Sequence, residues 1–311
     1  MRLVVNSFPG GFNWPLFVAC DTGLFAREGL SVEVQSTAGS IAQMTDFAAG
    51  RCDIVLTAFD NIVAYVDGEG EAPIGAQPEF CAFVGCDSSF LNLIAAPRIA
   101  SYDDLRGQRP SVDAATTGYA FVLYEMLRLR GLARGIDFQE ERVGGTLQRF
   151  ADLRAGGHPA TMMSSPYDVL ALAEGFRRLD RAIDVIGPYQ GNVAAARRGW
   201  ATRNEAAMVG FTRAWLAAIT WLYDPKNLNE AQEILQRNVA GMNNDLARAS
   251  AAIMLDPTDG FFRDGQLRAD GVASVLALRK RYMPGCTASN DAARYSDLRY
   301  WEAAGGRNAS L

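Results

Sequence analysis

The sequence predicts an α/β protein of two lobes joined by chain crossings, each lobe built from β-strands and flanking helices. Three observations support this fold class. Residues 3–34 read as strand, loop, helix and strand, and patterns of the same kind recur between residues 80 and 196. From residue 204 onward the pattern is mostly helical, so this part must pack back onto the two blocks. A chain of 311 residues is long enough for two lobes.

The first β-α-β unit contains an aromatic loop. The apolar residues 3–5 predict a strand, and the loop that follows contains Phe8, Phe12 and Trp14 together with proline and two glycines. A helical pattern begins at Leu16, and residues 30–34 return to the alternation of a strand. The loop therefore lies at the carboxyl end of the first strand, where open α/β sheets bind their ligands.

The remaining chain gives a regular series of expected elements. We expect strands at residues 52–58, 80–85, 91–97, 111–112 and 160–163, with a return strand across residues 183–196. The expected helices cover residues 41–50, 101–107, 120–132, 146–157, 206–223, 229–238, 244–254 and 271–282.

Composition excludes several classes of protein. No apolar run approaches the ~20 residues of a membrane-spanning helix. A net charge of -5 spread along the chain argues against a nucleic-acid partner, which needs a concentrated basic face. Five cysteines at irregular spacing and a single histidine give no metal site, and we expect buried thiols, although Cys81 and Cys86 could meet around a turn. No cofactor is expected.

A polar segment precedes the helix expected at residues 120–132. Thr116, Thr117 and Gly118 leave backbone N–H groups free at the start of this helix, which suits an anionic or strongly polar ligand group. The alternative is an ordinary N-cap in which Thr116 or Thr117 satisfies the first turn. The position mirrors that of the first loop, because both follow a strand of an α/β unit.

Several motifs resemble one family of binding proteins. They are an AxxxGLFxxEGLxVE segment at residues 19–34, AAGRCDI at residues 48–54, DDLRG at residues 103–107, LRAG at residues 153–156 and DLRYW at residues 297–301. Together they resemble the substrate-binding proteins of ABC importers in the nitrate, sulfonate, taurine and thiamine-precursor group. The resemblance covers essentially the whole chain. In one departure, residues 156–160 lack the aspartate that many members carry there.

The resemblance implies a type II periplasmic-binding fold, in which each lobe is a mixed β-sheet flanked by helices and a cleft lies between the lobes. Residues 1–93 and 194–311 would form lobe I, residues 94–193 would form lobe II, and the lobes would close on a small molecule by a hinge motion. The implied partners are the membrane permease and ATPase subunits of an ABC importer, with the binding protein itself a monomer and not an enzyme. The implied location is the periplasm after removal of an export signal, or the cytoplasm if there was none, because the chain begins directly on its first strand.

By position in that fold, twelve residues are expected to contact the ligand. Lobe I would contribute Phe12, Asn13, Trp14, Thr57, Asp60 and Asn61, and lobe II would contribute Thr116, Thr117, Tyr119, Ser165, Tyr167 and Tyr189. Each also has a purely structural interpretation: Phe12 and Trp14 could pack the lobe, Asp60 could cap a helix, and Tyr189 could line the hinge.

The chemistry of these residues narrows the class of ligand. Many aromatic rings favour stacking on a planar ligand, and the helix start at Thr116 suits a carboxylate, a sulfonate or a polar ring edge. Asp60 would favour a cation or an N–H donor. We therefore expect a small aromatic or heteroaromatic, polar or anionic molecule. The alternative is a cytosolic enzyme on the same fold that acts on a small aromatic acid, as a decarboxylase does, with Asp60, His158 or Cys86 as its reactive group.

Overall fold

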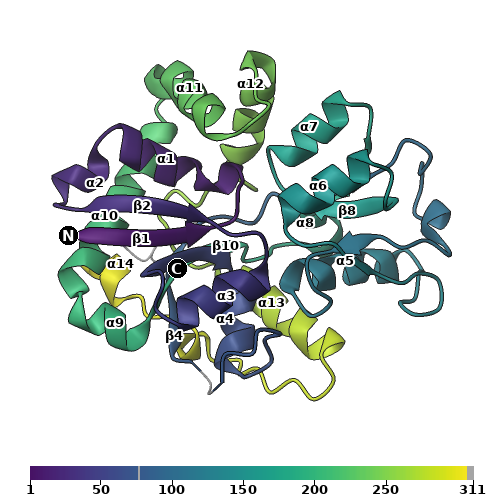
Figure 1. The fold of residues 1–311 in the computed structure, drawn as a ribbon, viewed down its shortest axis with the longest axis horizontal. Helices are drawn as coiled ribbons and strands as arrows, with labels where there is room; N and C mark the ends of the chain where they lie inside the picture. The colour runs from purple at the N-terminus through teal and green to yellow at the C-terminus, as the bar shows by residue number, and fades with distance from the viewer. Residues whose placement is uncertain (76–77, 307–311) are drawn as a thin grey trace.

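A computed structural model describes residues 1–75 and 78–306 and confirms the predicted α/β class. Within these residues the chain forms two five-stranded mixed sheets, which lie side by side with helices around each (Figure 1). We call each sheet with its flanking helices the first and the second lobe. The residue boundaries proposed for the lobes stay a prediction.

The first sheet has the strand order β2-β1-β3-β10-β4. Its strands are β1 Arg2–Ser7, β2 Ser31–Ser36, β3 Ile54–Ala58, β4 Phe80–Gly85 and β10 Asn192–Arg197. β1 pairs in parallel with β2 and β3, whereas β10 runs antiparallel between β3 and β4. The parallel strands bring the loops after β1 and β3 to one edge of the sheet.

The second sheet has the order β7-β6-β8-β5-β9. Its strands are β5 Asn92–Ala95, β6 Ser111–Val112, β7 Glu141–Arg142, β8 Ala160–Met163 and β9 Arg177–Arg181. β6 is parallel to β7 and β8, and β5 is antiparallel to β8 and β9. The chain crosses between the sheets twice, once between β4 and β5 and once between β9 and β10.

Helices cover both faces of the first sheet. One face carries α1 Trp14–Asp21, α2 Leu24–Arg27, α10 Glu205–Leu222, α11 Leu228–Asn238 and α14 Arg299–Ala303, and the other carries α3 Ser40–Ala48 and α4 Phe59–Val66. Strand periodicity explains this division, because Ile54 and Leu56 pack on the first face and Val55 on the second. No helix in the described part of the chain is both long and apolar enough to cross a membrane.

Helices α5 Gly118–Leu129, α6 Thr146–Arg154, α7 Tyr167–Ala173 and α8 Ala182–Ile186 flank the second sheet, and α9 Arg198–Arg203 follows β10. Two late helices reach across from the first lobe: α12 Asn244–Met254 contacts α7, and α13 Ala269–Tyr282 packs against both α4 and α5 (Figure 1). One hydrophobic core therefore continues through α13 from Val55 in the first sheet to Phe121 in α5 and Leu93 in the second sheet.

The region before β10 differs from the sequence prediction. Residues 183–186 belong to helix α8, and the strand begins only at Asn192. The apolar side chains of Ile183, Val185 and Ile186 are only partly buried, so they turn on the surface and do not enter a sheet. β9 was not predicted, because its sequence RRLDR is charged; as an edge strand that pairs only with β5, it leaves these side chains partly exposed.

Candidate functional site

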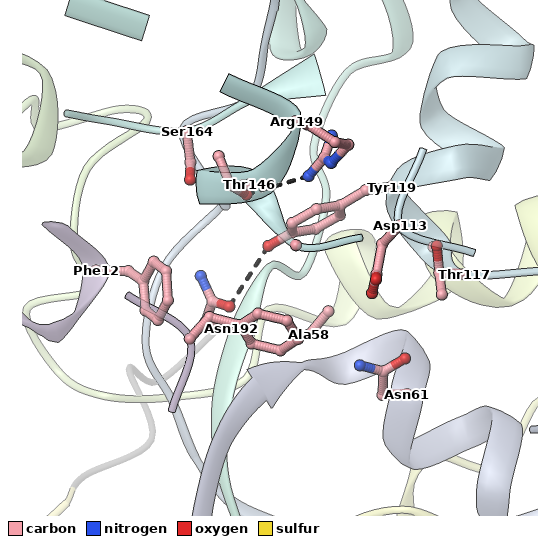
Figure 2. Close-up of a pocket in the computed structure, with 13 residues that line it drawn as sticks. Phe12, Ala58, Asn61, Asp113, Thr117, Tyr119, Thr146, Arg149, Ser164 and Asn192 are labelled. Atoms are coloured by element: carbon pink, nitrogen blue, oxygen red, sulfur yellow. Dashed lines mark hydrogen bonds between the residues drawn. The ribbon is translucent and has the colours of Figure 1, made fainter. Parts of the chain in front are cut away.

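A pocket that is partly open to solvent lies between the two lobes (Figure 2). Strand ends of both sheets supply most of its walls, as expected for open α/β sheets. It is lined by Phe8 and Phe12 after β1, Ala58 and Asn61 at the junction of β3 and α4, Asp113 after β6, Thr117, Gly118 and Tyr119 at the start of α5, Gly145, Thr146 and Arg149 of α6 and its cap, Ser164 after β8, and Asn192 of β10.

Backbone hydrogen bonds join the lobes across the rim of this pocket. The Gly11 N–H in the loop after β1 donates to the Ser165 carbonyl of the second lobe at 3.1 Å. The Gly145 N–H at the cap of α6 donates to the Ala38 carbonyl of the first lobe at 3.1 Å. Both contacts require the lobes to be close together, so the structure is a closed form.

A carboxylate reinforces the same rim from the first lobe. One oxygen of Glu71 accepts from the backbone N–H and the hydroxyl of Thr116, at 3.1 and 2.6 Å. Its other oxygen accepts from Arg142 Nη1 at 2.9 Å. Thr116, one of the expected ligand residues, is thus used to join the lobes.

Arg149 carries the positive charge of the pocket. It lies on the buried face of α6 and is only 3 % exposed. Its Nε donates to the Gly144 carbonyl, Nη1 donates to Thr161 Oγ1 and the Met162 carbonyl, and Nη2 donates to Thr146 Oγ1. A guanidinium has five N–H donors, so one N–H on Nη2 keeps no partner among the described residues.

The charge of Arg149 has no counter-ion in contact with it. No carboxylate of the described residues lies within 4.0 Å of its nitrogens. Burial lowers the pKa of this guanidinium, while Asp113 acts in the opposite direction. An arginine stays protonated in proteins even so, and a buried cation without a counter-ion is costly. The pocket therefore favours a ligand that brings negative charge to Arg149.

Aromatic rings form the apolar part of the pocket. Phe12 approaches from the first lobe and Tyr119 from the second (Figure 2), and Phe8 of the first lobe also lines the pocket. The Tyr119 hydroxyl shares a hydrogen bond of 2.7 Å with Ser89 Oγ and donates to Asn192 Oδ1 at 3.4 Å. Ser89 and Asn192 belong to the two crossing segments, so these contacts fix the ring of Tyr119 against the connection between the lobes.

The two crossing segments enclose a buried carboxylate. Asp87 accepts from the backbone N–H of Ser89 and from the backbone N–H and side-chain amide of Asn192, at 2.7 to 3.1 Å. Burial raises the pKa of Asp87 to about 6, against the effect of these donors, and the neighbouring Asp259 acts in the same direction as burial. Asp87 thus joins both crossing segments directly behind the pocket.

This raised pKa predicts a pH dependence of stability. A carboxyl whose folded pKa exceeds its unfolded value stabilises the fold at low pH, and this contribution is lost as the pH rises through about 6. In an Asp87→Asn variant the loss is absent. The free energy of unfolding of the variant minus that of the wild type should therefore increase, by up to about 3 kcal/mol, between pH 4 and pH 7.5. Urea unfolding at a series of pH values measures it.

Asp104 supplies a control of opposite sign. Its carboxylate accepts from the backbone N–H groups of Ala100 and Ser101, and these bonds lower its pKa. For an Asp104→Asn variant, the free energy of unfolding of the variant minus that of the wild type should decrease as the pH rises. The wild type gains stability as its Asp104 carboxylate loses its proton, and the variant does not. A difference for Asp87→Asn that is constant with pH would contradict the assignment of a raised pKa.

Four of the twelve expected ligand residues line the pocket: Phe12, Asn61, Thr117 and Tyr119. Two others support the lining from behind. Asn13 accepts from Ser7 Oγ and donates to the Phe8 carbonyl at 2.7 Å, and Thr57 accepts from the Asn61 amide at 2.9 Å. Asn13 and Thr57 therefore fix the loops that carry Phe8 and Asn61.

The other expected residues lie outside the pocket lining. Trp14 is fully buried and its indole donates to the Ala231 carbonyl. Asp60 forms an ion pair with Arg279, and Ser165 donates to Asp168. The ring of Tyr167 packs on Phe150, and the buried hydroxyl of Tyr189 lies beside Gly118. The proposed enzymatic groups also lie elsewhere: Cys86 is in the core, and His158 contacts Asp152 at the far end of α6.

None of the residues that line the pocket is a cysteine. All five cysteines are free thiols; Cys52, Cys81 and Cys86 are buried, Cys286 is partly exposed and Cys20 is exposed. The described residues contain no cluster of His, Cys, Asp or Glu that could hold a metal ion. The prediction of buried thiols is therefore correct for three of the five cysteines.

Sequence reasoning missed the two charged residues of the pocket. Arg149 could have been found from the pattern of α6, because it shares the buried face with Phe150 and Leu153 and a charge on an apolar face needs an explanation. Asp113 follows β6 directly, the same signal that pointed to the loops after β1 and β3. Ser164 and Asn192 also lie at strand ends.

Comparison with known proteins now places the chain. The model of the NMT1-like family matches residues 8–236, which is well over half of the sequence. The chain belongs to the NMT1-like family. No curated protein sequence matches this NMT1-like chain at a significant level.

Solved structures share the fold of this NMT1-like protein over nearly their full length. The periplasmic nitrate-binding protein NrtA from Synechocystis PCC 6803 has a TM-score of 0.78 at 14 % identity, over 99 % of this chain and 89 % of NrtA. The alkanesulfonate-binding protein SsuA from Xanthomonas axonopodis pv. citri, bound to MOPS, has a TM-score of 0.75 at 14 % identity, over 94 % of this chain and 97 % of SsuA.

A third similar structure is a mutant of DszB in complex with biphenyl-2-sulfinic acid. Its TM-score is 0.63 at 12 % identity, over 97 % of this chain and 98 % of DszB. At these identities the likeness concerns the fold alone. The resemblance predicted from the sequence is confirmed, and the NMT1-like chain has the two-lobed fold of the periplasmic binding proteins.

Proposed function

We propose that this protein is the solute-binding component of an ABC importer, which captures a small polar or anionic molecule with an aromatic or heteroaromatic part by closure of its two lobes. The observation that carries the proposal is the closed pocket itself, in which a buried arginine without a counter-ion lies beside Phe8, Phe12 and Tyr119. Rings offer stacking surfaces, and the guanidinium and the start of α6 offer donors to an anionic group.

The partners and the location belong to the same proposal. A closed, loaded binding protein would deliver its ligand to a permease and an ATPase subunit, and it would act in the periplasm as a monomer. Support comes from the fold shared with NrtA and SsuA, both named as binding proteins.

An enzyme on this fold is the second candidate, and the likeness to DszB is the observation in its favour. The composition of the pocket weighs against it. Its lining contains neither cysteine nor histidine, and Asp113 is its only carboxylate. A nucleophile next to a base, which covalent catalysis requires, is therefore missing from the lining.

A thermal-shift screen with mass spectrometry distinguishes these two functions. The panel contains aromatic acids, pyrimidines, sulfonates and inorganic anions. A ligand at a hundred times its dissociation constant should add about 2.7 kcal/mol of stability, which raises the melting temperature by a few degrees in a chain of this size. Recovery of the bound compound unchanged is expected. Conversion of the compound would establish the enzyme, and a response to inorganic anions alone would contradict the organic ligand class.

A further inference from the structure

We propose that the ligand is a zwitterionic aminocarboxylate, with its carboxylate held by Arg149, its ammonium group held by Asp113 and an apolar or aromatic side chain against Phe8 and Phe12. The inference rests on the proposed function, because it names the substrate class of the same pocket. It depends on the two charged side chains of the lining, which are of opposite sign (Figure 2).

Arg149 provides the site for the carboxylate. The remaining N–H of Nη2 lies next to Thr146, which also lines the pocket, so a carboxylate there would receive a charge-assisted hydrogen bond. Thr146 is the first residue of α6, whose positive helix end adds to the attraction. The four hydrogen bonds that Arg149 makes to protein oxygens hold the guanidinium in place before the ligand arrives.

Asp113 provides the site for the ammonium group. Its Oδ2 accepts from the Ser40 N–H of the first lobe at 3.1 Å, and its Oδ1 has no hydrogen-bond partner among the described residues. None of the arginines, lysines or the histidine in the described part of the chain forms an ion pair with it. Asp113 is partly buried, so a cationic group of the ligand would gain from an under-used acceptor.

Arg149 and Asp113 influence each other without touching. Asp113 favours the charged form of Arg149, yet no ion pair within 4.0 Å joins them. Because Arg149 and Asp113 do not neutralise each other by direct contact, each can pair with the opposite charge of a ligand that carries both. A net anion would be attracted by Arg149 and repelled by Asp113, whereas a zwitterion is matched at both ends.

The other residues of the pocket lining suit the uncharged part of a zwitterionic ligand. Phe8, Phe12 and Ala58 offer apolar surface, and no further charged side chain lines the pocket. The carboxylate of Asp87 lies behind Asn192, outside the lining. The net charge of the lining is therefore zero, as a zwitterion requires.

The test is a calorimetric titration of the full chain with matched compounds. A thermal-shift screen of the twenty protein amino acids selects the one that raises the melting temperature most. That amino acid, L-phenylalanine, 3-phenylpropanoate and 2-phenylethylamine are then titrated separately. The aminocarboxylate should bind at least about tenfold more tightly than an analogue that lacks either charge, since each lost charge leaves a pocket charge unmatched. Equal or tighter binding of 3-phenylpropanoate would overturn the inference, as would no response to any amino acid.

An Asp113→Asn variant makes the test specific to the pocket. The amide oxygen can still accept from the Ser40 N–H, so closure is preserved while the negative charge is lost. The ratio of the affinities for 3-phenylpropanoate and L-phenylalanine should rise at least about tenfold in favour of the anion. An unchanged ratio would overturn the inference. Asp245→Asn on the exposed surface of α12 is the control and should leave the ratio unchanged.

The outcomes separate this inference from the proposed function. If only net anions bind and are recovered intact, the zwitterion is wrong and the binding function stands. If an amino acid is bound and converted, the pocket chemistry is supported and the transport function fails. If no compound of either panel binds, both fail.

Discussion

Replacement of Arg279 with methionine should lower the free energy of unfolding by about 3–5 kcal/mol, because it leaves a buried carboxylate without its counter-ion. Arg279 in α13 and Asp60 in α4 are both fully buried, and Arg279 Nη1 donates to the two oxygens of Asp60 at 2.9 and 3.0 Å. Arg279 Nη2 also donates to Glu69 at 2.8 Å. Equilibrium unfolding in urea measures the loss.

Two further variants make this result interpretable. Arg248→Met removes an arginine that is 71 % exposed from a surface pair with Asp245, and should change the stability by less than about 0.5 kcal/mol. Addition of Asp60→Asn to Arg279→Met should recover more than half of the loss, because the fully buried charge is then removed and only the partly exposed Glu69 has lost its partner. An Arg279→Met variant as stable as Arg248→Met would contradict the assigned role.

A Gly118→Ala variant should bind the strongest compound of the thermal-shift screen about 10- to 100-fold more weakly. Gly118 begins α5 in the second lobe, and a Cβ atom there would lie 2.4 Å from the Tyr189 hydroxyl and 2.5 Å from Asp60 Cβ. Asp60 cannot yield because Arg279 holds it. The added methyl group therefore separates α5 from α4, and the closed form becomes less populated.

Calorimetry and small-angle X-ray scattering test this prediction together. The radius of gyration of the liganded Gly118→Ala variant should exceed that of the liganded wild type, since its lobes stay further apart. The control is Gly199→Ala in α9, where the nearest atom to the new methyl group is Arg203 Nη1 at an ordinary 3.5 Å. Wild-type affinity in Gly118→Ala would show that closure does not depend on this contact.

The sequence predicted most of the fold because local pattern and tertiary environment agree there. Residues 160–163 were expected as a strand and form β8, and the strand expected at residues 80–85 is β4. Prediction failed where an element depends on the neighbour that it pairs with. β9 is charged and forms only because β5 offers it an edge, and α8 turns the chain from one sheet to the other.

The site was predicted in outline for the same reason. Strand ends are visible in the sequence, so the loops that carry Phe12, Asn61 and Tyr119 could be located. Which side of a loop faces the pocket depends on packing between distant segments. Trp14 points away from the pocket because its indole N–H donates to the Ala231 carbonyl of α11. The sequence around Trp14 gives no sign of this contact. Arg149 lies on a helix face that becomes a pocket wall only when the lobes meet.

Helix α13 has a consequence for how the protein is made. Both sheets are complete once residue 197 has been synthesised, yet the helix that packs against both α4 and α5 is formed by residues 269–282. A chain that emerges from the ribosome, or from an export channel, with its N-terminus first would therefore hold its two sheets together by the crossing segments and the rim contacts alone, without the hydrophobic contacts that α13 adds. The hydrophobic core shared by the two lobes would be completed only when the C-terminal region docks, as one of the last steps of folding.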